Sequence, residues 1–195
     1  MLTLASGSPR RAKILTQHDV AFRVLRTDAE EVAIQPGRMY NAEETGAIVE
    51  RNACLKVWAG FKAAGGGAGG ILAADTVVWF RNRILGKPHD LDEAAQYLRE
   101  MSGKVHSVFT GVAYLPPGAT EDTEQRFALV ESRVRFRTLS EAMIADYVAR
   151  VRPTDRAGAY DIDESGDLIV ESWTGSYENI MGLPVEPLRE WGIVR

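Results

Sequence analysis

The chain has 195 residues, of which 45% are hydrophobic and 26% are charged, a balance that argues against disorder and fits a folded globular protein. Its formal net charge of -4 argues against general binding to DNA or to anionic membranes. The single cysteine, Cys54, excludes an internal disulfide, and together with only three histidines it argues against a structural zinc site.

The N-terminal segment begins with a short apolar run at 2–4, which predicts a strand. The run is far too short for a signal peptide or a membrane span, so we expect a cytoplasmic protein without a membrane segment. Ser8 followed by Pro9 is a typical helix start and predicts a helix to about His18. A second strand is predicted at 22–25.

The middle of the chain predicts a long helix at 42–64, which ends in the glycine run 65–70. That run matches the pattern G-x-G-x-x-G, but it follows a helix and precedes a strand, the reverse of the dinucleotide-binding context. We therefore interpret it as a flexible connection. Two apolar β-type runs follow at 71–74 and 77–80, interrupted by Asp75 and Thr76.

The remaining elements continue the alternation of strand and helix signals, which favours an α/β protein. Asp90 with Glu93 forms a capping-box pattern. No repeat or linker divides the chain, so we expect one domain over residues 1–195. The predicted elements are a strand at 84–85, a helix at 90–101, long strands at 105–114 and 126–137, a helix at 140–150 and a last short helix at 187–191.

The loop and helix start around Ser6, Ser8, Arg10 and Arg11 form the first candidate site. A helix N-terminus offers unpaired N–H groups and a positive dipole end, which attract phosphate. The hydroxyls and guanidiniums add charge-assisted donors at the same place. The same residues also fit a capped surface helix with solvated arginines, and the local sequence leaves both interpretations open.

A second candidate is Asp75, a carboxylate at the carboxyl end of an apolar run, which is the usual ligand side of strands in α/β sheets. An ionised aspartate buried there needs a cation, a metal or an arginine as partner, although a turn-forming aspartate is the alternative. Lys56 and Lys87 are cations suited to phosphate, and Glu31 offers oxygen of the kind that Mg²⁺ binds. Each could equally be a solvated side chain.

Together these segments resemble the Maf family of nucleotide pyrophosphatases over essentially the whole chain. Each matching piece is weak alone, but eight in the same order are highly specific. The pieces are LASGSPRR (4–11), Glu30-Glu31, ACLK (53–56), ADTVV (74–78), GKP (86–88), SGK with FTGVA (102–113), DRAGAY (155–160) and GSYENIMGLP (175–184).

The resemblance implies a fold related to the inosine-triphosphate pyrophosphatases, a mixed twisted sheet flanked by helices, with two lobes around a nucleotide cleft. It implies hydrolysis of a nucleoside triphosphate to the monophosphate and pyrophosphate, with Mg²⁺ or Mn²⁺ as cofactor. Asp75 would be the catalytic carboxylate and, with Glu31, would bind the metal. The triphosphate would be held by Ser6, Ser8, Arg10, Arg11, Lys56 and Lys87.

The base preference rests on three positions. Arg10 and Thr76 resemble the branch of the family that acts on dTTP and UTP, whereas Asp163 replaces the glutamine that reads the base in that branch. A carboxylate only accepts hydrogen bonds, while an amide also donates them, so a modified nucleotide stays open as a substrate.

The same resemblance implies two alternatives, a 7-methyl-GTP pyrophosphatase and a nucleotide-binding inhibitor of septum formation. A purely structural α/β domain would leave the gathered charges unexplained. The expected partner is the nucleotide, with no stable binding of nucleic acid or membrane. A homodimer is compatible with the sequence, which does not specify the oligomeric state.

Overall fold

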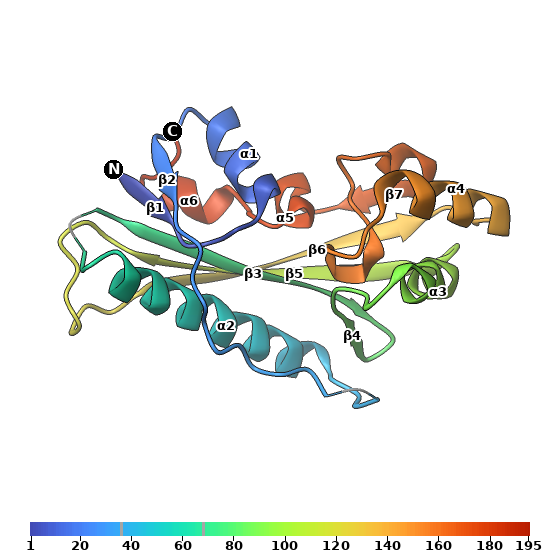
Figure 1. Ribbon diagram of the computed structural model, residues 1–195, viewed down its shortest axis with the longest axis horizontal. Coiled ribbons are helices and arrows are strands. Elements are labelled where there is room, and N and C mark those ends of the chain that lie inside the picture. The colour runs from blue at the N-terminus through green and yellow to red at the C-terminus, as the bar shows by residue number, and fades with distance from the viewer. Residues whose placement is uncertain (36, 68) are drawn as a thin grey trace.

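The computed structural model describes residues 1–35, 37–67 and 69–195, and its described part is built on a seven-stranded mixed sheet (Figure 1). The strand order is β2-β1-β3-β5-β6-β7, with β4 paired to β3. The strands are β1 (Leu2–Leu4), β2 (Phe22–Val24), β3 (Ile71–Phe80), β4 (Arg83–Leu85), β5 (Val105–Leu115), β6 (Arg126–Phe136) and β7 (Val170–Thr174).

Helices cover both faces of this sheet, which confirms the predicted α/β class. In Figure 1, α2 lies along one face, whereas α1, α5 and α6 lie on the other. The helices are α1 (Pro9–Gln17), α2 (Ala42–Ala63), α3 (Leu91–Met101), α4 (Glu141–Val151), α5 (Tyr177–Met181) and α6 (Glu186–Glu190), with short 3-10 turns η1 (Ala157–Ala159) and η2 (Gly166–Leu168). None of these helices is long and apolar enough to cross a membrane.

Strand direction divides the sheet into two parts. β1 pairs in parallel with β2 and with β3, whereas β3, β5, β6 and β7 pair antiparallel in succession. Because β1 is parallel to β2, the segments that leave these two strands emerge at the same edge of the sheet. The β1–α1 loop and the segment after β2 are therefore neighbours.

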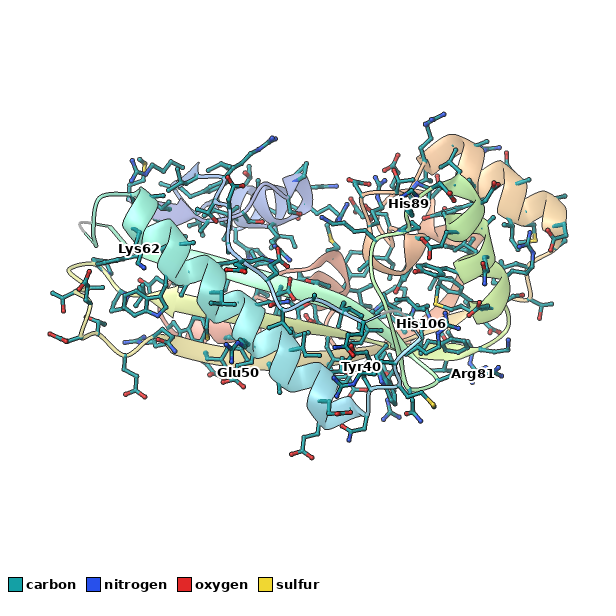
Figure 2. The ribbon with its side chains drawn as sticks, turned by 60° about the horizontal axis from the view of Figure 1, so that its bottom comes forward. Tyr40, Glu50, Lys62, Arg81, His89 and His106 are labelled. Carbon is teal, nitrogen blue, oxygen red and sulfur yellow. The ribbon has the colours of Figure 1, made fainter. Side chains whose placement is uncertain are left out.

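The long helix α2 forms because its start is well capped and one of its faces is apolar. Asn41 accepts from the Glu44 N–H, and the Glu44 carboxylate accepts from the Asn41 N–H, a complete capping box. Val49 and Val57 are buried on the face toward the sheet. Figure 2 shows the helix running along the sheet, with Glu50 in its first half and Lys62 near its end.

The structure corrects one prediction that bears on the site. Residues 71–80 form a single strand, because the backbone of Asp75 and Thr76 pairs with Gly111 and Thr110 of β5 without interruption. Asp75 therefore lies in the middle of β3 and not at the end of a strand, where the sequence had placed it.

Other predictions are confirmed with small differences. Asp90 caps α3 by accepting from the Glu93 N–H, but the Glu93 carboxylate accepts from the N–H of His89 instead of completing the box. The glycine run 65–70 joins α2 to β3, and its member Ala68 lies outside the described residues. Helix α5 was not predicted.

Candidate functional site

A cavity of about 670 Å³ opens where the β1–α1 loop, α2, the middle of β3 and η1 meet. Nine of the ten predicted site residues line it, and the exception is Asp163. The nine are Ser6, Ser8, Arg10, Arg11, Glu31, Lys56, Asp75, Thr76 and Lys87. Side chains that are far apart in the chain thus share one cavity.

Asp75 is a buried acid in the lining of this cavity, with 7% of the residue exposed. The Lys56 Nζ donates to its Oδ1 across 2.6 Å, and the Asn52 Nδ2 donates to its Oδ2 across 3.1 Å. An ionised carboxylate can remain buried here because both of its oxygens have a partner. The middle of β3 and two neighbouring turns of α2 therefore hold one fixed carboxylate at the cavity wall.

Lys56 also joins Asp75 to Glu31, whose Oε2 lies 2.9 Å from the same Nζ. The Glu31 side chain is 49% exposed, so it keeps access to the cavity. Across residues 1–35, 37–67 and 69–195, no group of three His, Cys, Asp or Glu side chains could hold a metal. Two carboxylates fit a Mg²⁺ or Mn²⁺ ion that takes its remaining ligands from water and substrate phosphates, the usual situation for Mg²⁺.

Arg11 is fixed by three acceptors. Its Nε donates to the Gly182 carbonyl at 2.8 Å, its Nη1 to Ser6 Oγ at 2.9 Å and its Nη2 to Thr76 Oγ1 at 3.1 Å. Burial lowers the pKa of Arg11 to about 10, and the nearby Asp75 charge offsets part of that effect. Thr76, one of the positions in the predicted base-selecting pattern, is thus bonded to Arg11.

The start of α1 has donors available for an anion. Ser8 is the N-cap residue, but its side chain makes no capping hydrogen bond, and its own N–H donates to Ser6 Oγ at 3.2 Å. The N–H groups of the first helical turn have no partner within the helix, and Pro9 removes only one of them. Loop and helix start together are suited to binding phosphate oxygens.

The far end of the cavity contains an ion network around Asp161, which the sequence did not single out. Asp161 is buried and accepts from the Arg156 Nε at 3.1 Å and from the Asp163 N–H at 2.9 Å. The Arg10 Nη1 lies 3.5 Å from the Asp161 Oδ2. The Asp163 carboxylate points elsewhere and pairs with Lys13 of α1.

Two of these contacts escaped sequence reasoning for different reasons. Asn52 lies four residues before Lys56, so the spacing of the two residues on one helix face could have indicated its role. Asp161 and Asp163 are two residues apart in an irregular segment, and nothing in the local sequence says which one faces the cavity.

Comparison with known proteins gives a consistent result. A family model described as Maf-like protein matches residues 1–191. The dTTP/UTP pyrophosphatase of Desulfitobacterium hafniense is 39% identical to this chain, over 99% of the chain and 86% of that protein. The enzyme of the same name from Shigella dysenteriae is 41% identical over 94% of the chain and 87% of its own length. The one from Thermosipho melanesiensis is 34% identical, over 99% and 96%.

Among solved structures, the chain is similar to a nucleoside-triphosphatase, a dITP/XTP pyrophosphatase, from Mycobacterium abscessus. The identity is 14%, the alignment covers 71% of this chain and 74% of that one, and the TM-score is 0.39. A likeness this slight carries no conclusion about the chemistry.

Proposed function

The chain belongs to the Maf family, and we propose on this basis that it hydrolyses nucleoside triphosphates to the monophosphate and pyrophosphate, with dTTP and UTP as substrates. The observation that carries the proposal is the position of Asp75. This buried carboxylate is held by Lys56 and Asn52 in a cavity that the start of α1 also lines.

Binding of the triphosphate would depend on a local excess of positive charge. The substrate carries about four negative charges, and a chain of net charge -4 attracts it only where cations gather. Arg11 is held in the cavity lining by its three hydrogen bonds, and Lys87 lies exposed at the cavity. Ser6, Ser8 and the first turn of α1 would supply neutral donors to the same phosphate chain.

Asp75 would orient a water molecule and accept its proton as the water oxygen attacks the α-phosphorus. The bond between the α-phosphorus and the bridging oxygen then breaks, and pyrophosphate leaves. Lys56 and Arg11 would offset the negative charge that develops on the leaving group. Glu31 and Asp75 would hold the divalent cation, which when bound would add Lewis-acid stabilisation of the phosphate oxygens.

The two alternatives from the sequence have less support. The relatives described above are named for dTTP and UTP, not for 7-methyl-GTP. An inhibitor of septum formation that only binds nucleotides would not need a buried acid with a fixed lysine partner.

The test is to purify the protein and measure pyrophosphate and monophosphate release from dTTP, UTP, CTP, 7-methyl-GTP and pseudouridine triphosphate, with Mg²⁺ and Mn²⁺ compared. Asp75→Asn should lower kcat by about 10²- to 10⁴-fold, the range for loss of a general base. Asp122→Asn, at an exposed loop position, makes the same chemical change as a control. Near-normal turnover of Asp75→Asn at saturating Mg²⁺ would exclude the proposed role, and release of orthophosphate would exclude the reaction.

A further inference from the structure

Arg26 is a cavity-lining cation that the proposed mechanism does not yet use. It follows β2, which runs parallel to β1 with Val24 opposite Leu4, and the Leu25 N–H donates to the Leu4 carbonyl at 2.9 Å. This pairing places residue 26 beside the loop that leaves β1. The β1–α1 loop and Arg26 are thus set side by side by the backbone of the sheet.

The Arg26 side chain lies against the backbone of that loop at Gly7. A Cβ atom built on Gly7 would lie 3.3 Å from Arg26 Nε, 3.5 Å from its Cγ and 3.6 Å from its Cδ. Gly7 does not adopt a positive φ, so its backbone conformation does not require glycine. A side chain at Gly7 would instead crowd the arginine, which would have to shift by a few tenths of an ångström.

The Arg26 guanidinium has no ion-pair partner among the residues that the structure describes. Within the described parts of the chain, no carboxylate lies within 4.0 Å of the Arg26 guanidinium. Two other cations of the cavity do have carboxylate partners, because Lys56 is paired with two carboxylates and Arg10 lies near Asp161. Arg26 is also exposed, so its donors are free to meet an anion at the start of α1.

We propose that Arg26 is a substrate-binding residue that donates to non-bridging oxygens of the phosphate chain held at the start of α1, and that Gly7 provides the space for it. This inference rests on the proposed function, because it concerns the substrate of the same cavity. The guanidinium fork suits a phosphate group with two accessible oxygens. Since Arg26 does not contact Asp75, its contribution falls on binding and not on the chemical step.

The test compares Arg26→Ala with Arg23→Ala, using kcat and KM for dTTP and the Kd for inorganic tripolyphosphate. Arg23 is a matched control because it lies on β2, carries the same charge and donates to Thr3 Oγ1 at 3.0 Å, but does not line the cavity. Loss of one charge-assisted contact should raise KM and Kd about tenfold in Arg26→Ala, with kcat changed less than about threefold. Arg26→Lys should recover part of the loss. Equal values for the two alanine variants would overturn the inference.

Gly7→Ala gives a second, independent test. The added methyl group should displace the arginine and raise the Kd for tripolyphosphate, and the double variant with Arg26→Ala should bind no more weakly than Arg26→Ala alone. Additive effects would show that Gly7 acts on the loop and not through Arg26. If the wild-type protein hydrolysed no nucleotide but tripolyphosphate binding still depended on Arg26, the proposed function would fail while the anion site remained.

Discussion

A Cβ atom added at Gly111 would lie 2.9 Å from the carbonyl oxygen of Val49, so β5 and α2 meet through backbone atoms at this point. Gly111 is also the register partner of Asp75 in β3. The close approach of the helix beside Asp75 brings Asn52 and Lys56, on the same face of α2 as Val49, within hydrogen-bonding distance of the carboxylate. A glycine of the sheet therefore helps to build the site.

Gly111→Ala should lower both stability and activity. The methyl group would push α2 away from the sheet, at a cost of about 2 kcal/mol in the free energy of unfolding, as for other overpacked cores. Because Lys56 and Asn52 would move with the helix, kcat should fall as well. Urea denaturation and pyrophosphate release measure the two effects. Gly86→Ala is the control for stability, since its methyl group would meet nothing within 4 Å. Equal stability of the two variants would contradict the prediction.

Glu31→Gln should weaken the binding of the divalent cation without abolishing activity. The amide keeps the size of the side chain but removes one of the two carboxylate charges joined by Lys56. We expect the Mg²⁺ concentration for half-maximal activity to rise about tenfold, while EDTA should abolish turnover by the wild type. A Mg²⁺ titration of initial rates measures this shift. Glu30→Gln changes an exposed neighbour outside the cavity lining, and it should leave the Mg²⁺ concentration for half-maximal activity unchanged.

His106 should make stability depend on pH. The ring is buried, its Nε2 lies 2.9 Å from the Tyr160 hydroxyl, and its Nδ1 has no partner in the described structure. Burial lowers the pKa of His106 from 6.5 to about 3. Between these values the unfolded chain binds more protons than the folded chain, so the free energy of unfolding falls as the pH drops. His106 alone should account for a loss of about 2 kcal/mol between pH 7.5 and pH 5.

His106→Gln isolates this contribution, because glutamine does not titrate and can still bond to Tyr160. Its free energy of unfolding in urea should change less between the two pH values than that of the wild type. His89→Gln removes an exposed histidine, and its free energy of unfolding should change with pH as that of the wild type does. If His106→Gln and the wild type showed the same pH dependence, the buried ring would not be the origin of the effect.

Asp161 and Asp163 should respond differently to the same change. Asp161→Asn removes the buried charge that faces Arg10 and Arg156, and it should cost about 3 kcal/mol in unfolding free energy. Asp163→Asn breaks a pair with the half-exposed Lys13 and should cost much less, because solvent screens an exposed ion pair. We also expect Asp161→Asn, and not Asp163→Asn, to alter the ratio of dTTP to CTP hydrolysis. A nucleotide panel for both variants would decide this, and a shift confined to Asp163→Asn would contradict the expectation.

Features whose cause lies within a few residues could be predicted from the amino-acid sequence alone. Asp90 caps α3 and Ser140 caps α4, because each side chain accepts from an N–H three positions later. Pro9 begins α1, because its fixed φ suits the first helical position. The motifs in their order also indicated the family by resemblance, and the candidate residues and that resemblance together named nine residues that line the cavity.

The contacts among these residues, by contrast, depend on the packing of distant segments. Asp75 lies in the middle of a strand because β5, which is more than thirty residues later in the chain, pairs with the residues before and after Asp75. Arg11 contacts Thr76 of β3, and Arg10 faces Asp161, which is in the last third of the chain, because α1 packs beside segments that are distant in the sequence. Contacts between distant segments depend on how helices and strands pack, and no local pattern of residues encodes that geometry.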